Sequence, residues 1–390
     1  MGKLRVAFTL IGGKSWTGGY NYLLNLVRAL DNYKAEYIEP IMFFGDDVDE
    51  DEMKPFSALS GVKVVRSTVF DQQHANMRLI RALVFGKDNA VQRVFSENRV
   101  DCVFEAAQFH GWRSGYPSVA WIPDFQHRCL SGMFNPIAYW KRELGFRAQI
   151  YSGRTVMLSS EDSSKVCEKL YHSVAGRIHT VPFAVPMPSN IDAAMARSTA
   201  DRYGLPARYY ILPNQFWRHK NHMLVIDALD SLKKDGHTDI VVATTGHTED
   251  PRHPDYFSTL QSKITEYSLE SQFRVLGRIP YQDLLPLVFA SEALINPSLF
   301  EGWSTTVEEA KALGVPMILS DIDVHIEQTA GNARYFDRYS ARALTEALLD
   351  SPKRMISSIE QLSATNEKRM AVFADKFVST IRHAIHSQTS

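Results

Sequence analysis

The sequence is poor in cysteine and has no large excess of charge of either sign. Its three cysteines, Cys102, Cys129 and Cys167, are odd in number and far apart, which excludes a disulfide framework and a zinc site of the CxxC kind. Lysine and arginine number 43 against 44 acidic residues, so net charge provides no reason to expect a nucleic acid as partner. We therefore expect a protein of a reducing compartment.

Long hydrophobic runs are also missing. The first residues, MGKLRVAFTLIGG, lack the apolar stretch of a signal peptide, and no run of about 18 apolar residues occurs that would cross a bilayer. These absences favour a cytoplasmic location, with any membrane contact peripheral on the inner face of the membrane. Low-complexity tracts and short repeats are absent too, which excludes solenoid and disordered classes.

Short apolar runs alternate with segments of helical periodicity. The order LRVAFTLI, GGKSWTGG and YNYLLNLVRAL predicts a strand, a glycine loop and an amphipathic helix, which is how a doubly wound α/β domain begins. Buried strands are expected next at IEPIMFF, VKVVRS, DCVFEA, SVAWIP and TVMLSS. The proline-rich HTVPFAVPMPSN is typical of a linker, and a second series of strands follows at YYILPN, DIVVATTG, FRVLG, ALINPS and PMILSD.

The sequence therefore predicts an α/β protein of two facing Rossmann-like, doubly wound domains. We place the first at residues 1–187 and the second at residues 188–365, with a hinge at Pro182–Pro188. Residues 366–390 are expected to form a C-terminal helix that crosses back to the N-terminal domain and packs on it. Because parallel strands bind ligands beyond their carboxyl ends, the site is expected in the loops that follow the strands.

The stretch FEGWSTTVEEAKALGVP carries three glutamates around a predicted helix start. If Thr305 caps the helix, Glu308 completes a capping box; if Thr306 caps it, Glu309 does so. We favour the first arrangement, which leaves Glu309 and Glu301 without a structural task. The helix amides suit a phosphate and the carboxylates suit sugar hydroxyls, whereas an acidic first turn that stabilises its own helix is the alternative.

This stretch resembles the signature of the retaining GT-B glycosyltransferases of family 4, also called glycosyltransferase group 1. In that pattern seven residues separate two glutamates, matched by Glu301 and Glu309, and a Gly-x-Pro follows, matched by Gly314 and Pro316. The resemblance implies that Glu309 binds the ribose of a nucleotide sugar and that Glu301 holds hydroxyls of the donor sugar. It also implies a donor diphosphate at the loop residues Gly302, Trp303, Ser304 and Thr305.

The second motif is LPNQFWRHKNH, a strand end that enters a helix. In the family this turn carries an arginine and a lysine that neutralise the diphosphate leaving group. Lys220 matches the lysine, but Gln215 stands at the arginine position, and Arg218 is the nearest replacement. Ordinary solvated cations at a helix start are the alternative for both basic residues. Arg278 in LGRIPYQ is expected to flank the nucleobase.

The glycine loop GGKSWTGG satisfies neither the P-loop nor the GxGxxG pattern. By the resemblance, this loop approaches the donor phosphate, with Gly18 and Gly19 at the point of close backbone approach. Tight-turn glycines are the alternative for Gly12 and Gly13.

The stretch SVAWIPDFQH places Asp124 and His127 at the carboxyl end of a strand. Many family members carry His-Asp in this turn, and here Pro123 replaces the histidine. Asp124 is expected to position or deprotonate the acceptor hydroxyl, with His127 or His110 assisting. A helix cap is the structural alternative for a lone aspartate after a strand.

No metal site is expected. His247, Asp250 and His253 lie in a proline-rich loop without ligand geometry, and the family binds its donors without a metal. The segment from Arg128 to Arg154 contains five basic residues and one acid, with aromatic residues between them. We expect it to form a surface that meets an anionic membrane or a lipid-diphosphate-linked glycan, with an ordinary positive face as the alternative.

The sequence thus predicts a retaining, metal-independent hexosyltransferase that uses a nucleoside diphosphate sugar as donor substrate and no cofactor. The acceptor is expected to be a hydroxyl of a glycan or lipid-linked saccharide in surface polysaccharide biosynthesis. GDP-mannose is the donor that the resemblance favours, while rhamnosyl, glucosyl and N-acetylglucosaminyl transfer stay open. The alternatives are a sugar epimerase of the same fold and a catalytically silent sugar-nucleotide-binding or scaffold protein.

Overall fold

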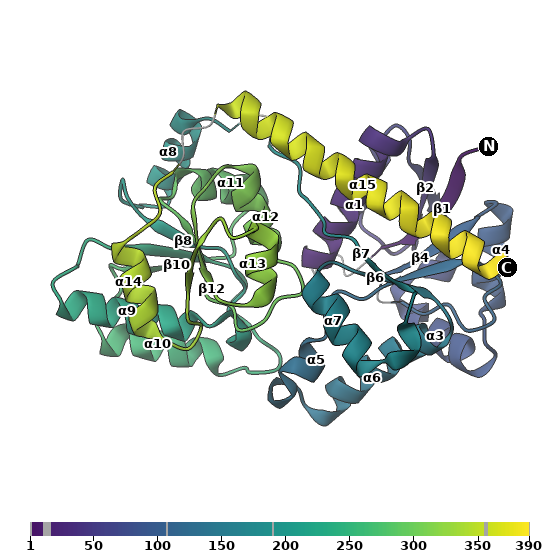
Figure 1. Cartoon of the computed structure of the whole chain (residues 1–390), viewed down its shortest axis with the longest axis horizontal. Helices are drawn as coiled ribbons and strands as arrows, with labels where there is room; N and C mark the ends of the chain where they lie inside the picture. The colour runs from purple at the N-terminus through teal and green to yellow at the C-terminus, as the bar shows by residue number, and fades with distance from the viewer. Residues whose placement is uncertain (1, 11–16, 107, 189–190, 355–357, 390) are drawn as a thin grey trace. The chain divides into compact units, whose positions relative to one another are not determined.

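The computed structural model divides into two compact units (Figure 1). Unit 1 comprises Met1–Ala184 and Glu367–Ser390, and unit 2 comprises Val185–Asn366. Each unit is a sheet covered by helices, so the predicted α/β class is confirmed. Within the described part of the chain, no helix is long and apolar enough to cross a membrane. The described residues are 2–10, 17–106, 108–188, 191–354 and 358–389.

Unit 1 is built on a parallel sheet. Within the described residues this sheet has seven strands in the order β3-β2-β1-β4-β5-β6-β7. Every pairing is parallel. The order reverses between β1 and β4, which makes this the topological switch point. The strands are β1 (Leu4–Thr9), β2 (Ile38–Phe44), β3 (Lys63–Arg66), β4 (Cys102–Ala106), β5 (Ser118–Trp121), β6 (Thr155–Leu158) and β7 (Ile178–Thr180).

Helices cover both faces of this sheet. On β1, Ala7 faces Val91 and Phe95 of α4, while the adjacent Phe8 turns to the other face. There Phe8 stacks on Phe377 of the last helix, with ring centroids 5.8 Å apart, and α1 packs beside that helix (Figure 1). The helices are α1 (Thr17–Lys34), α2 (Glu50–Ser57), α3 (Ala75–Val84), α4 (Asn89–Glu97), α5 (Gln126–Cys129), α6 (Pro136–Tyr151) and α7 (Glu161–Leu170).

The C-terminal helix begins earlier than predicted. Helix α15 spans Ile359–Thr389, although the apolar stripe that predicted it starts only at Met370. Met370, Phe373 and Phe377 are buried, and residues 367–390 belong to unit 1. The stripe therefore marks the part of α15 that packs on the first sheet, and the helix continues upstream of it.

Unit 2 repeats the architecture. Its described residues form a sheet of six parallel strands in the order β10-β9-β8-β11-β12-β13, with the reversal between β8 and β11. The sequence did not predict β7 or β13, because IHT and RYF are not continuous apolar runs. The strands are β8 (Tyr210–Leu212), β9 (Val242–Thr245), β10 (Phe273–Gly277), β11 (Leu294–Asn296), β12 (Met317–Ser320) and β13 (Arg334–Phe336).

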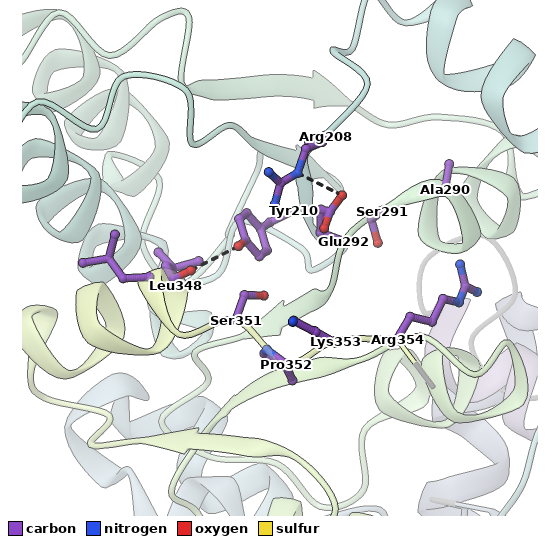
Figure 2. Close-up of a pocket in the computed structure, with 11 residues that line it drawn as sticks. Arg208, Tyr210, Ala290, Ser291, Glu292, Leu348, Ser351, Pro352, Lys353 and Arg354 are labelled. Atoms are coloured by element: carbon purple, nitrogen blue, oxygen red, sulfur yellow. Dashed lines mark hydrogen bonds and ion pairs between the residues drawn. The ribbon is translucent and has the colours of Figure 1, made fainter. Parts of the chain in front are cut away.

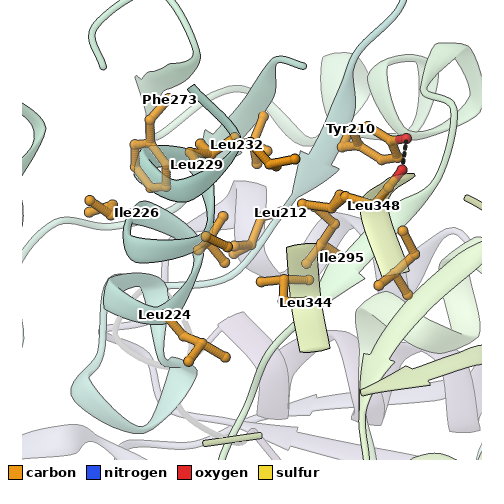
Figure 3. Packing of buried hydrophobic residues seen from close by; sticks show 14 of the residues in the cluster. Tyr210, Leu212, Leu224, Ile226, Leu229, Leu232, Phe273, Ile295, Leu344 and Leu348 are labelled. Atoms are coloured by element: carbon orange, nitrogen blue, oxygen red, sulfur yellow. Dashed lines mark hydrogen bonds between the residues drawn. The ribbon is translucent and has the colours of Figure 1, made fainter. Parts of the chain in front are cut away.

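The second sheet is also buried on both faces. On one face, Leu212 and Ile295 meet Leu229 of α9 and Leu344 of α14 in a buried cluster (Figure 3). Helices α8, α11 and α12 pack on the other face. A ligand of this sheet is therefore expected at the strand ends. The helices are α8 (Ala193–Arg202), α9 (His222–Lys234), α10 (Tyr256–Glu266), α11 (Tyr281–Ala290), α12 (Thr305–Ala312), α13 (Asp323–Thr329) and α14 (Ala341–Leu349).

Candidate functional site

Two residues that were predicted to bind the nucleotide-sugar donor meet at the switch point of the unit 2 sheet. Lys220 ends the short helix η6 (Arg218–Lys220) that follows β8, and Glu301 lies in the loop that follows β11. Because β8 and β11 are neighbours, residues 81 positions apart in the sequence form an ion pair. Lys220 Nζ lies 2.6 Å from Glu301 Oε1, and the two side chains are only 12% and 10% exposed. The fold thus places an enclosed pair of opposite charges where doubly wound sheets bind ligands.

The surroundings of Glu301 favour its ionised form. Burial by itself would raise the pKa of this carboxyl, but Lys220 and the hydroxyl of Ser298 bring the pKa below its ordinary value. Ser298 Oγ donates to Glu301 Oε1 over 2.7 Å. A buried carboxylate that is ionised and fixed in its orientation is suited to accept hydrogen bonds from sugar hydroxyls.

Asn296 is a site residue that sequence reasoning missed. It ends β11, and its side chain is fully buried. Its Oδ1 lies 2.6 Å from Ser298 Oγ and accepts from Asn214 Nδ2 at 3.1 Å, while its Nδ2 donates to Ser304 Oγ at 3.0 Å. Asn296 therefore ties the end of β8 and the start of α12 to the loop of Glu301. The available signal was an amide side chain at the end of the apolar strand ALINPS.

The start of α12 differs from both predicted caps. Ser304 takes the N-cap position, so the helix begins at Thr305 and Glu308 lies one position beyond N3. The predicted capping box is therefore wrong. Glu308 Oε1 instead accepts from Lys311 Nζ and from Gln328 Nε2, each at 2.9 Å. Gln328 Oε1 accepts the Ser304 amide proton at 3.1 Å, so a side chain from α13 does what the local pattern assigned to Glu308.

Glu309 is a second enclosed carboxylate. It is 3% exposed, and its Oε1 accepts the hydroxyl proton of Tyr281 from the start of α11 at 3.0 Å. Burial raises the pKa of Glu309 to about 7, a rise that the Tyr281 hydroxyl opposes. This carboxyl is therefore close to half ionised at neutral pH, and additional hydroxyl donors would stabilise its charged form.

The other predicted donor residues of unit 2 lie in loops at the same edge of the sheet. Gln215 Oε1 accepts the His247 amide proton at 2.6 Å, so Gln215 joins the loop after β8 to the loop after β9. Arg218 is exposed beside Lys220, and Arg278 is exposed in the turn after β10. The loop and first turn that lead into α12 contain Gly302, Trp303, Ser304 and Thr305, of which the Ser304 amide is already bonded to Gln328.

The histidine-rich loop after β9 is held by an ion pair. Asp250 is buried and lies 3.1 Å from Arg252 Nε, and the guanidinium of Arg252 lies over the Trp217 ring. Among the residues that the structure describes, no group of three or more His, Cys, Asp or Glu side chains is arranged to hold a metal ion.

Gly18 and Gly19 lie in a helix rather than in the predicted loop. Helix α1 begins at Thr17, so both glycines belong to its first turn, with Gly19 buried and Gly18 exposed. The apolar periodicity becomes visible only after the glycines, and glycine lowers helix propensity, which explains the late predicted start. The rest of the predicted loop, residues 11–16 with Gly12 and Gly13, lies outside the described residues.

Asp124 and His127 occupy separate environments in unit 1. Asp124 Oδ1 accepts from the Gln126 amide at 2.8 Å and from Arg142 Nη2 at 2.7 Å, and the Asp124 side chain remains 24% exposed. His127 is fully buried, and its Nε2 lies 3.0 Å from Glu143 Oε2. Burial lowers the pKa of His127, so the ring is neutral at physiological pH. These contacts correct the prediction that His127 assists Asp124 at an acceptor hydroxyl.

Glu143 organises this buried cluster, although the sequence presented it only as an isolated acid. Arg147 Nε donates to Glu143 Oε1 at 2.6 Å, and the Tyr171 hydroxyl donates to Glu143 Oε2 at 2.8 Å. Burial would raise the pKa of Glu143, but these partners and His127 bring it below its ordinary value. The cluster fastens α5 and α7 to α6.

The Glu143→Ala variant is expected to lower the free energy of unfolding by about 3 kcal/mol, because it leaves buried donors without their acceptor. Urea unfolding measures the change. The Glu168→Ala variant, at an exposed position on the neighbouring α7, is the control and should change stability by less than about 0.5 kcal/mol. Equal stability of the two variants would contradict this account of the cluster.

The segment from Arg128 to Arg154 is not the uniform basic surface that the sequence predicted. Arg154 is only 3% exposed and lies 3.0 Å from the buried carboxylate of Glu105. Glu143 is fully enclosed in the same segment. Helix α6 does expose four large apolar side chains, namely Ile137, Trp140, Leu144 and Tyr151.

A pocket of about 480 Å³ lies at the opposite edge of the unit 2 sheet (Figure 2). Its lining includes Arg208 and Tyr210 at the start of β8 and Glu292 just before β11. Arg208 Nε donates to Glu292 Oε1 at 3.3 Å. Because these residues stand at the amino ends of the strands, the pocket is separate from the Lys220–Glu301 pair.

Known proteins resemble this chain in sequence. Residues 205–365 match the family model described as glycosyl transferases group 1. The O-antigen chain mannosyltransferase RfbU of Salmonella typhimurium is 27% identical over 169 residues. The match covers 42% of this chain and 45% of the Salmonella protein, so the chain spans less than half the length of this relative.

Solved structures resemble the chain over its whole length. A sucrose-phosphate synthase from Thermosynechococcus elongatus has a TM-score of 0.69 at 17% identity, covering 99% of both chains. A glycosyltransferase from Rickettsia africae has a TM-score of 0.66 at 15% identity, covering 99% of this chain and 97% of its own. The Anabaena protein HepE, in complex with UDP and glucose, has a TM-score of 0.64 at 15% identity over 99% of both chains. Residues 205–365 therefore resemble the glycosyl transferases group 1 family, in a chain that has the GT-B fold.

Proposed function

We propose that this protein is a glycosyltransferase that moves a hexose from a nucleoside diphosphate sugar to a hydroxyl of a glycan or lipid-linked saccharide, in surface polysaccharide biosynthesis. The observation that carries the proposal is the enclosed Lys220–Glu301 pair at the switch point of a group 1 domain. A lysine there neutralises a departing diphosphate, while a carboxylate beside it holds the donor sugar. The name of the Salmonella relative makes mannose the first sugar to test.

The roles of the residues that bind the nucleotide sugar follow from their charges and from the number of hydrogen bonds that they can donate. An ammonium group has three N–H donors, and Glu301 accepts one from Lys220, which leaves two for phosphate oxygens. Arg218 is exposed beside it and adds positive charge. The amides of the first turn of α12 add the positive end of a helix dipole. Glu309, which carries no positively charged partner among the contacts described above, is proposed to accept two ribose hydroxyls.

The proposed reaction retains the anomeric configuration. The bond between C1 of the sugar and the diphosphate oxygen breaks, and a bond from C1 to the acceptor oxygen forms on the same face. The acceptor proton passes to the departing diphosphate oxygen, so the reaction uses no protein nucleophile. Asp124, partly exposed and fixed by Arg142, is proposed to position the acceptor hydroxyl.

Nucleotide binding is the first test. Among GDP, UDP, dTDP and ADP, at least one is expected to raise the thermal unfolding midpoint, because a ligand that binds the native state stabilises it. The control is Arg208→Gln in the pocket at the opposite edge of the sheet, which should keep the full shift. Loss of the shift in that variant, or no shift with any of the four nucleotides, would contradict the proposed site.

Transfer itself is the second test. The nucleotide that binds is supplied as its mannose, glucose, rhamnose and N-acetylglucosamine conjugates, with release of nucleoside diphosphate as the readout. Release without acceptor, and faster release with lipid-linked acceptor, is expected of a transferase. A protein that binds the nucleotide sugar but never releases nucleoside diphosphate would instead be a silent binder. The anomeric coupling constant of the product, measured by NMR, decides between retention and inversion.

A further inference from the structure

Helix α3 of unit 1 (Figure 1) is exposed along most of its length in the part of the chain that the structure describes. Of its ten residues, only Ala82 is buried. The exposed fractions of the large apolar side chains on and beside it are 49% for Met77, 39% for Leu79, 52% for Ile80, 39% for Leu83, 67% for Val84, 68% for Phe85 and 50% for Trp112. We refer to these seven residues as the α3 surface. Exposed apolar groups on this scale mark a surface that meets a partner.

Trp112 belongs to this surface because Gly86, after the end of α3, contacts the loop after β4 that carries Trp112. Gly86 ends α3 in the left-handed conformation, with φ of 77°, and its carbonyl accepts the Arg113 amide proton at 2.8 Å. A Cβ atom on Gly86 would lie 2.8 Å from the Trp112 ring, so the ring covers this glycine closely. The loop after β4 is thereby fastened to the end of α3, and Phe85 and Trp112 lie at adjoining positions.

The charged residues on α3 and in the turn after it are basic, although the exposed Asp47 lies near Arg78 of α3. No acidic residue occurs between Asp71 and Asp88, and both aspartates are buried. Lys87 and Arg113 are exposed directly beside the apolar side chains. An apolar centre with aromatic side chains and a basic rim is the chemistry of a segment that lies in the headgroup region of an anionic bilayer.

We propose that the α3 surface docks on an anionic phospholipid bilayer. Val84, Phe85 and Trp112 enter the headgroup region, where aromatic side chains are favoured, and Lys87 and Arg113 contact lipid phosphates. This inference stands independently of the proposed catalytic function.

Two other arrangements fit these observations less well. In a two-fold contact between copies of this chain, the basic residues of both copies would come together and repel each other. The segment from Arg128 to Arg154 has its own charge largely neutralised within unit 1. The internal pairs are Arg142 with Asp124, Arg147 with Glu143 and Arg154 with Glu105.

Flotation of the full chain with vesicles tests the proposal. Wild type is expected to float with phosphatidylcholine vesicles that contain phosphatidylglycerol, and much less with phosphatidylcholine alone. The Val84→Glu/Phe85→Glu variant should reduce the floated fraction roughly tenfold, because two exposed apolar side chains that would enter the headgroup region become charged. Tyr339→Glu, at a residue of unit 2 that is 76% exposed, is the matched control and should float like wild type.

Further variants separate the alternatives. Lys87→Gln/Arg113→Gln keeps the apolar side chains and should lose the preference for anionic vesicles; it also tests the proposal if the glutamate variant fails to fold. Ile137→Glu/Leu144→Glu on α6 should float like wild type. The proposal is overturned if wild type does not float at low salt, or if only the α6 variant loses flotation. It is also overturned if wild type sediments as a dimer that Val84→Glu/Phe85→Glu dissociates without any vesicle binding.

Discussion

Replacement of Lys220 by methionine is expected to slow sugar transfer by about 10²- to 10³-fold, the loss typical of one preorganised donor at a developing negative charge. Lys220 lies in the loop after β8, with its ammonium directed at Glu301 from the neighbouring loop. Methionine keeps most of the length of the side chain and removes the ammonium group, with its charge and its N–H donors. Single-turnover measurements with saturating donor separate this loss from a change in donor affinity.

The same substitution is expected to destabilise the fold. It leaves Glu301 only 10% exposed without its cation, and removing one partner of an enclosed ion pair costs about 3 to 5 kcal/mol. Because the pKa of Glu301 is lowered in the folded protein, its contribution to stability is present above its ordinary pKa of 4.5. That contribution is lost as the pH falls through the lowered value, so the cost of Lys220→Met should be larger at pH 7 than in acid.

The double variant Lys220→Met/Glu301→Gln decides between a catalytic and a structural pair. Without either charge, the variant should recover most of the lost stability in urea unfolding, yet transfer should stay slow. A double variant with restored transfer would show that the pair serves only the fold. Equal stability of Lys220→Met and wild type would show that the Lys220–Glu301 ion pair does not form as described.

The Glu309→Gln variant is expected to gain stability and lose activity. Burial raises the pKa of Glu309 from 4.5 to about 7 in the folded protein, so the folded state binds more protons than the unfolded state between these values. The contribution of Glu309 to wild-type stability therefore falls by about 3 kcal/mol in total as the pH rises from 4.5 to 7, and it stays level above that range. Glutamine carries no charge, so the variant escapes this loss.

Urea unfolding at pH 5 and at pH 8 measures the difference. The stability of Glu309→Gln relative to wild type should rise by about 3 kcal/mol between the two pH values. The control is Glu346→Gln, an exposed position on α14, which should show no such dependence. An unchanged difference in stability between Glu309→Gln and wild type at the two pH values would rule out the raised pKa.

The expected loss of activity in Glu309→Gln comes from the donor. A carboxylate that accepts two ribose hydroxyls loses charge-assisted hydrogen bonds on conversion to an amide, so KM for the donor should rise about tenfold or more. Ribose binding also favours the ionised form of Glu309, so wild type should release protons when the nucleotide binds near pH 6.5. Calorimetry in buffers of different ionisation enthalpy detects that release, and its absence would separate Glu309 from the ribose.

Local patterns predicted the elements better than their ends. Apolar runs located eleven of the strands, because a strand buried on both faces of a parallel sheet is a continuous apolar run, but β7 (IHT) and β13 (RYF) lack that signal. The start of α12 was misplaced because Gln328, from another helix, bonds the Ser304 amide. His127 was predicted to assist at the acceptor hydroxyl for a similar reason. Nothing near it in the sequence shows that Glu143 and Tyr171 enclose it.

The sequence by itself determined the α/β class, the two domains of strands and helices, and the glutamate motif with Glu301 and Glu309, because these are properties of periodicity and short spacing. Only the tertiary structure decided that Lys220 meets Glu301, that Asn296 links their loops, and that most apolar side chains of α3 are exposed in the described structure. Strand order brings together residues far apart in the chain, and burial depends on what packs above a side chain. Neither strand order nor burial can be read from the local pattern of residues.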